Sequence, residues 1–226
     1  MADGDRTEYS EARRLDDEGL DYYLKGDLQR AAESFRKALE LSPDSKAALY
    51  SLGMVSGQLG RFEESRDYFS HLVRILDGEG DAIDPTMRSA ARGGLGAAFL
   101  SLWGAANQEA ASSLAQQAEG EFRVATALDP ASSGGWVGLG ISLHMVGRLE
   151  DAERALREAI EINPEDTGAR ERLQDVLEDK LERRLFELGY LSKLNEPIRD
   201  FTPYDNRIPI EVKGKPLSEI VVEDRR

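Results

Sequence analysis

The chain has 226 residues, 40% of them hydrophobic and 32% charged, and its mean hydropathy of −0.49 is typical of a soluble, folded protein. No run approaches the roughly 18 apolar residues that span a bilayer, and the acidic first residues are not a secretory signal, so we expect no membrane insertion and a cytoplasmic location. Cysteine is absent, which excludes disulfides and cysteine-ligated metal centres.

The formal charge of −14 is unevenly distributed along the chain. Residues 190–226 carry seven Lys or Arg and seven Asp or Glu, so residues 1–189 hold the whole excess. A strongly acidic surface repels phosphate backbones and anionic membranes. We therefore expect no nucleic-acid partner and favour a protein or peptide partner that is apolar and either neutral or basic. The alternative is that the acidic residues only keep the protein soluble and do not select a partner.

The first predicted unit, residues 12–45, reads as a pair of amphipathic helices. Its apolar or small residues recur at steps of three and four, which places them on one helical face. Gly26 interrupts the pattern where the first helix should end, and Pro43 follows the second helix. The residues that carry the pattern are Leu15, Gly19, Tyr22, Leu28, Ala31, Phe35 and Ala38.

The same spacing recurs in residues 46–79, 89–132 and 133–166, and Gly19 and Gly53 lie one period of about 34 residues apart. Ser45, Ser132 and Asp166 are expected to cap helix N-termini. The third unit is irregular, with an acidic loop at 77–85 and a further insertion at 104–113 that either lengthens its two helices or protrudes as a loop. The recurring residues are Gly53, Gly60, Phe62, Ser65, Phe69 and Leu72, then Gly96, Ala118, Phe122, Ala125 and Pro130, then Gly140, Leu143, Gly147, Leu149, Ala152, Leu156, Ala159 and Pro164.

These residues at this period resemble the tetratricopeptide repeat (TPR) family. The resemblance implies an all-α fold, a superhelical array of antiparallel helix hairpins. We expect a flexible N-terminus at 1–10 and four TPR-like repeats at 12–45, 46–79, 89–132 with the insertion, and 133–166. One apolar stripe predicts a capping amphipathic helix at 165–189, followed by a non-helical tail at 190–226 that is extended or a β-hairpin. The stripe comprises Ala169, Leu173, Val176, Leu177, Leu181, Leu185 and Leu188.

In TPR proteins the first helix of each repeat lines a concave groove. By family position, the expected groove and partner-binding residues here are mostly apolar, and the alternative is that they pack inward as core. Chaperone-binding members grip a carboxylate with a Lys, Asn and Arg clamp, which none of Asp16, Leu20, Ser51, Ala90 and Gly94 matches, so that role is disfavoured. The expected groove residues are Leu20, Tyr23, Leu24, Tyr50, Met54, Gln58, Ala97, Leu100, Val137, Ile141, His144 and Met145.

Nothing in the sequence predicts a catalytic residue, a cofactor site or a metal site. His71 and His144 lie far apart without a second ligand at a recognisable spacing, and His144 on a groove face is a better polar contact than a catalyst. The acidic residues of the loop at 77–85 superficially suggest calcium, but they do not follow the EF-hand spacing, so a solvated loop is the expectation. Those residues are Asp77, Glu79, Asp81 and Asp84.

The sequence therefore predicts a scaffold or adaptor without enzyme activity. It would bind a helix or an extended segment of another protein in an apolar groove, with its own tail at 190–226 as a candidate occupant or regulator. The alternative is a self-associating structural or assembly factor that uses the capping helix or the tail as its joint, so a homo-oligomer remains open.

Overall fold

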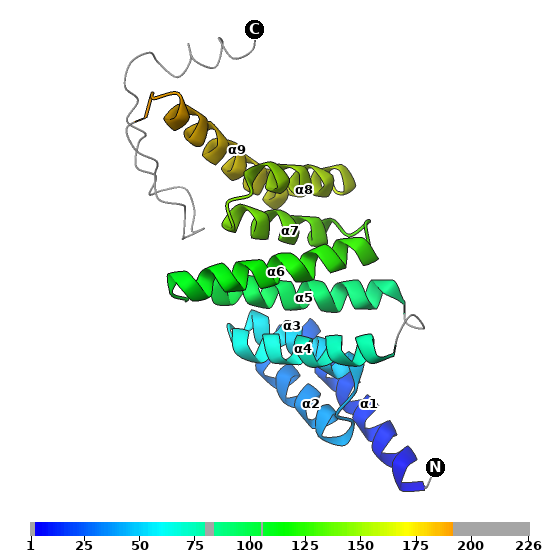
Figure 1. Cartoon of the computed structure of the whole chain (residues 1–226). Coiled ribbons are helices and arrows are strands. Elements are labelled where there is room, and N and C mark those ends of the chain that lie inside the picture. The colour runs from blue at the N-terminus through cyan, green and yellow to red at the C-terminus, as the bar shows by residue number, and fades with distance from the viewer. Residues whose placement is uncertain (1–2, 80–83, 105, 192–226) are drawn as a thin grey trace.

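The computed structural model describes residues 3–79, 84–104 and 106–191. Every regular element in these ranges is a helix, which confirms the predicted all-α class. In Figure 1 the helices follow one another along one direction, from α1 at the bottom to α9 near the top. They are α1 (Asp3–Leu24), α2 (Leu28–Leu41), α3 (Lys46–Gln58), α4 (Phe62–Gly78), α5 (Pro85–Trp103), α6 (Gln108–Leu128), α7 (Ser133–Met145), α8 (Leu149–Ile162) and α9 (Thr167–Glu187).

Consecutive helices pack against each other along the whole described chain. The hairpins are α1 with α2, α3 with α4, α5 with α6, and α7 with α8, and α9 then packs on α8. The first helix begins at Asp3, so residues 3–10 are helical instead of forming the flexible N-terminus that we expected. This segment contains no proline, and extending an existing helix adds one hydrogen bond for each residue that it orders.

Glycine ends the first helix of three hairpins, as the sequence predicts. Gly26 and Gly147 have φ of 78° and Gly60 has φ of 72°, a left-handed conformation that residues with a Cβ adopt at a cost. The predicted N-caps are also confirmed. The Ser45 hydroxyl accepts a hydrogen bond from the Ala48 amide, and Ser132 and Asp166 cap α7 and α9 in the same way.

The third hairpin is longer than its neighbours because its helices are longer. Of the two alternatives for residues 104–113, the structure shows the first: α5 extends to Trp103 and α6 begins at Gln108, with the Asn107 side chain accepting a hydrogen bond from the Ala110 amide at 2.9 Å. The hairpin of α5 and α6 accordingly projects beyond α4 and α7 at one side in Figure 1.

Aromatic rings of the second helices hold successive repeats together. Phe69 of α4 is 2% exposed and lies between Gly53 of α3 and Gly94 of α5. A Cβ at Gly53 would be 2.7 Å from the Phe69 ring, and a Cβ at Gly94 would be 2.4 Å from it, so both positions require glycine for this close approach. The same arrangement places Phe122 of α6 between Gly96 of α5 and Gly138 of α7.

Alternate helices differ in how closely they approach one another along the array. Helices α1, α3, α5, α7 and α9, which we call the first helices, each approach the next one directly. The second helices α2, α4, α6 and α8 do not approach one another to a comparable extent in the described ranges. In a curved stack the elements of the inner face are closer together than those of the outer face, so the first helices form the inner face.

The predicted apolar stripe of α9 divides into two faces. Ala169, Val176 and Leu185 are buried, whereas Leu177 and Leu181 are each 40% exposed. Only part of the stripe is buried, because among the described residues α9 packs on α8 and α7 alone. The predicted strands of the tail fall in residues 192–226, which lie outside the described residues.

Candidate protein-binding site

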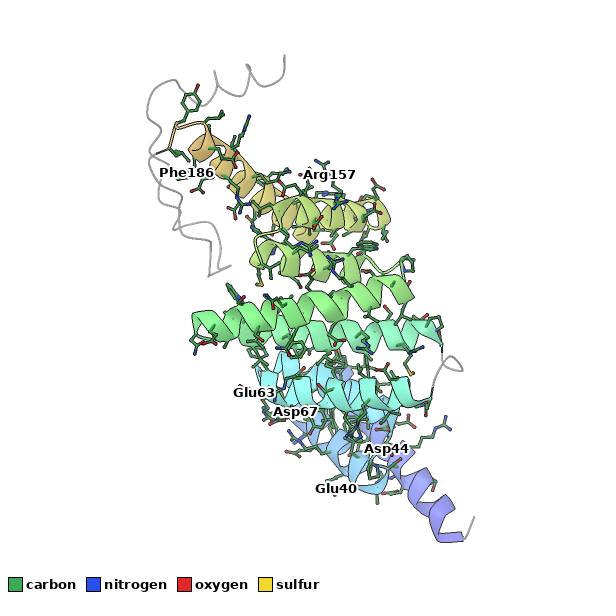
Figure 2. All side chains as sticks on the ribbon, in the orientation of Figure 1. Glu40, Asp44, Glu63, Asp67, Arg157 and Phe186 are labelled. Carbon is green, nitrogen blue, oxygen red and sulfur yellow. The ribbon has the colours of Figure 1, made fainter. Side chains whose placement is uncertain are left out.

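The inner face of the middle repeats carries almost no charge. Residues 47–58 of α3, 93–103 of α5 and 133–145 of α7 contain no Asp, Glu, Lys or Arg. The second helices, in contrast, are rich in charged residues, and the exposed side chains of Glu40, Glu63, Asp67 and Arg157 come from α2, α4 and α8 in Figure 2. Charged residues are thus absent from these segments of α3, α5 and α7 and frequent on the second helices and on α1.

At the N-terminal end of this face, large apolar side chains are exposed. Leu20 and Leu24 of α1 are 50% and 73% exposed, and Met54 of α3 is 38% exposed. Tyr23 and Gln58 connect the same two helices, because the Gln58 amide donates a hydrogen bond to the Tyr23 hydroxyl at 2.9 Å. The expected groove residues of α1 and α3 therefore include three apolar side chains that an incoming partner could cover.

Tyr50 contributes to the core as well as to the inner face. Its ring meets the Phe69 ring edge to face, with the ring centroids 5.7 Å apart, and it packs against the main hydrophobic cluster while remaining half-buried. This contact with Phe69 holds the Tyr50 ring in place.

The centre of the face is built from small residues. Ala97 is exposed, Leu100 is half-buried against the core, and a Cβ added at Gly93 would meet nothing within 4 Å. Gly94, the adjacent position, behaves in the opposite way because it packs on Phe69. The clamp position Gly94 is therefore part of the contact between repeats and does not open to the inner face.

At the C-terminal end the expected residues are half-buried. Val137, Ile141 and Met145 of α7 remain partly accessible. The side chain of His144 is only 9% exposed, and its Nε2 lies 2.7 Å from Oδ2 of Asp179 on α9. His144 therefore makes a polar contact that joins α7 to α9.

Asp16 of α1 is a partly buried carboxylate beside this face. The Ser45 hydroxyl donates to its Oδ2 at 3.5 Å, and its buried Oδ1 has no hydrogen-bond partner among the described residues. Burial raises the pKa of the Asp16 carboxyl, the Ser45 hydrogen bond opposes this shift, and the nearby Asp17 adds to it.

The acidic residues of the loop at 77–85 have structural partners. Asp77 pairs with Arg92 at 2.6 Å, Glu79 pairs with Lys46 at 2.5 Å, and the Asp84 side chain caps α5. Asp81 lies outside the described residues. Three of the four acidic side chains that superficially suggested calcium are therefore engaged in holding α3, α4 and α5.

Within the described ranges, no three His, Cys, Asp or Glu side chains are grouped so that they could hold a metal ion. His71 lies 3.2 Å from Asp44, far along the chain from the pair of His144 and Asp179. None of the helices in the described part of the chain has the length and hydropathy needed to cross a membrane.

The sequence pattern does not distinguish the glycines that have open space beside them from the glycines that pack against an aromatic ring. Gly53, Gly96 and Gly140 were recognised as repeat positions, but the second glycine that each ring of α4 and α6 touches, Gly94 or Gly138, was not. A signal exists in the sequence: each of the two lies two residues before a recognised glycine, at Gly96 or Gly140.

A family model described as tetratricopeptide repeat matches residues 17–79 and 97–167 of the chain. The chain belongs to the tetratricopeptide repeat family. As in that family generally, its fold is a protein interaction scaffold, and such proteins are generally non-catalytic.

Curated relatives are similar to parts of this chain. The BBSome complex member BBS4 of Bos taurus is 38% identical over 68 residues, which are 30% of this chain and 12% of that protein. The chain spans only 12% to 59% of the length of the curated relatives that it matches.

Solved structures show the same fold at low sequence identity. The thermophilic TPR protein TTC0263 of Thermus thermophilus has a TM-score of 0.59 at 20% identity, covering 79% of this chain and 83% of that one. The MamA fragment from Desulfovibrio magneticus RS-1 has a TM-score of 0.61 at 16% identity, covering 80% and 91%.

Proposed function

We propose that this TPR protein is a non-catalytic scaffold that binds a helix or an extended segment of another protein on the inner face of its first helices. The observation that supports the proposal best is the separation of charge. Residues 47–58 of α3, 93–103 of α5 and 133–145 of α7 are uncharged and partly apolar, whereas charged residues are frequent on the second helices and on α1.

The inner face suits an apolar ligand that approaches closely. Leu20, Leu24 and Met54 offer exposed apolar surface at one end, and Ala97 with the open position at Gly93 leaves room for a side chain or a backbone at the centre. Asp16, Asp17 and Asp21 of α1 border this surface, so basic residues on the partner would find opposite charges beside it.

A pair of matched substitutions tests the proposal. Met54→Glu places a carboxylate on the inner face at a side chain that is 38% exposed, and Val124→Glu places the same group on α6 of the outer layer at 40% exposure. Proteins captured from the source lysate by the unmodified chain are compared with those captured by each variant.

We expect Met54→Glu to lose the specific partner and Val124→Glu to retain it. Because both positions are exposed, circular dichroism should show the same helix content for both variants. Retention by Met54→Glu, or equal loss with both variants, would place the binding surface elsewhere.

A regulated form of this proposal has the chain's own tail, residues 190–226, entering the groove. A titration of the captured partner in the presence of a synthetic tail peptide tests it, because a peptide that occupies the groove would compete. Absence of competition would reject the tail as a groove ligand.

The second candidate function is that of a self-associating structural or assembly factor. The exposure of Leu177, Leu181 and Leu188 on α9 favours it, since apolar side chains on a terminal helix can join two copies. Light scattering over a range of concentrations tests it, and a mass that stays monomeric at all concentrations would reject it.

A further inference from the structure

Helix α9 has the register of a first helix. Its N-cap Asp166 follows the N-cap Ser132 of α7 by one repeat period of about 34 residues. In this register Gln174 of α9 occupies the place of Gly140 in α7, and Leu177 occupies the place of Leu143.

In α7 this face is covered by the second helix of the same hairpin. A Cβ at Gly140 would lie 2.6 Å from Leu156 of α8, and Leu143 is 2% exposed. In α9 the same face is open among the described residues, and Leu177 is 40% exposed.

The open face continues along the helix as a stripe with spacings of three and four residues. Leu177 and Leu181 are each 40% exposed and Leu188 is 49% exposed, so three exposed leucines lie on one side of a single helix, with Arg184 between the last two. Asp179, which contacts His144 of α7, lies on the opposite side of α9. We call this face the outer stripe of α9, and it comprises Arg170, Gln174, Leu177, Leu181, Arg184 and Leu188.

We propose that the beginning of the chain's own tail, residues 194–204, lies along the outer stripe as an extended strap. The chain leaves α9 at the correct place, because Leu191 is 6% exposed and packs on Leu185. From Leu188 back to Arg170 the stripe is about 27 Å long at 1.5 Å per residue. An extended chain covers that distance with about eight or nine residues, and residues 192–226 are available.

The composition of this part of the tail complements the stripe. Leu194, Ile198, Phe201 and Tyr204 supply apolar side chains for the exposed leucines. The same part of the sequence contains Glu196 and Asp200, with Asp205 directly after it, and these acidic residues can pair with Arg170 at one end of the stripe and with Arg184 near the other end.

The occupant is a strap and not the second helix of a fifth repeat. Each second helix in the described chain places a ring or a leucine on a glycine of its own first helix, and Gln174 replaces that glycine in α9. Pro197 and Pro203 also exclude a continuous helix in residues 194–204. This proposal concerns the face of α9 that points away from the inner face, so it does not rest on the proposed groove function.

The absence of cysteine permits a direct crosslinking test on the full chain. In one variant Leu181→Cys is combined with Ile198→Cys, and in the control Leu20→Cys on the inner face is combined with Ile198→Cys. A short bismaleimide reagent is added at low protein concentration, and the products are resolved by mass spectrometry.

We expect rapid crosslinking within one chain for the Leu181→Cys pair and much slower crosslinking for the Leu20→Cys pair. Crosslinks that join two chains would overturn the proposal in favour of a second copy on the stripe. Equal rates for both pairs, a faster reaction at Leu20→Cys, or no reaction at either pair would overturn it as well.

Limited proteolysis supplies an independent readout. The strap should protect the trypsin sites at Lys193 and Arg199, and Leu177→Glu combined with Leu181→Glu should accelerate cleavage there about tenfold by removing the apolar contacts. Leu20→Glu combined with Leu24→Glu is the matched control, which should leave the cleavage rate unchanged. An unchanged rate in the α9 variant, or the same acceleration in the control, would refute the strap.

Discussion

The neighbouring glycines of α5 allow a prediction in which the same substitution has opposite effects at adjacent positions. A Cβ at Gly94 would lie 2.4 Å from two atoms of the Phe69 ring. The Phe69 ring has no room to move away from Gly94, because Gly53 packs closely on its other side. A Cβ at Gly53 would be 2.7 Å from the ring, and Phe69 is only 2% exposed. A Cβ at Gly93 would meet nothing within 4 Å.

Two free-energy terms decide the outcome of Gly94→Ala. Replacing glycine with alanine inside a helix stabilises it by about 0.8–1 kcal/mol. Forcing a methyl group into a filled core costs roughly 1–3 kcal/mol, and here the neighbour is a ring held from both sides. We expect Gly94→Ala to lower the free energy of unfolding by roughly 1–2 kcal/mol, whereas Gly93→Ala has only the favourable term and should raise it by about 0.5–1 kcal/mol.

Urea denaturation followed by circular dichroism measures both variants, and the difference in sign is the readout. The double variant Phe69→Leu with Gly94→Ala serves as a check, because a smaller side chain should reduce the cost of the added methyl group. If Gly94→Ala is as stable as Gly93→Ala, the Phe69 ring does not bridge the second and third repeats as described.

Three further predictions concern polar groups between and beside the helices. Glu153 accepts hydrogen bonds from Lys180 of α9 and from Arg157, which lower the pKa of its carboxyl, so Glu153→Gln should destabilise the chain by about 0.5–1 kcal/mol at neutral pH. Because the pKa of Glu153 is lowered in the folded state, its stabilising contribution is complete above the ordinary glutamate pKa of 4.5 and should vanish as the pH falls through its folded-state pKa. Urea titrations at several pH values measure this change. Burial raises the pKa of Asp16, so Asp16→Asn should slightly raise the melting temperature at neutral pH. The variant should lose this advantage below pH 3.8, where the Asp16 carboxyl of the unmodified chain is protonated in both the folded and the unfolded state. A lower melting temperature of the variant at neutral pH would contradict this prediction. His144→Phe removes the hydrogen bond to α9 and should cost about 1 kcal/mol, seen as faster amide hydrogen exchange in α9 with unchanged exchange in α1 and α2.

The repeated spacing of glycine, alanine, aromatic and proline residues determines the architecture of this chain by itself. Helix ends at Gly26, Gly60 and Gly147 and N-caps at Ser45, Ser132 and Asp166 follow from local backbone conformation and short-range hydrogen bonds. Such features depend on residues a few positions apart, so the sequence specifies them directly.

The inner face could be predicted only in outline. Helical spacing placed Leu20, Met54 and Ala97 on the first helices, and the structure shows that these side chains are exposed. The same spacing could not distinguish them from His144, which the structure pairs with Asp179 of a helix one repeat further along the chain.

Contacts between repeats were decided by the tertiary structure. Gly93 and Gly94 are adjacent glycines that the local sequence does not distinguish. Gly93 has open space beside it, whereas Gly94 packs against the Phe69 ring of the preceding repeat. Likewise Val176 and Leu177 are neighbours with similar apolar character, and only Val176 is buried. A repeat pattern specifies each hairpin, but the angle at which one hairpin meets the next depends on side-chain volumes from both, and this angle decides which side of each helix is covered and which remains available for a partner.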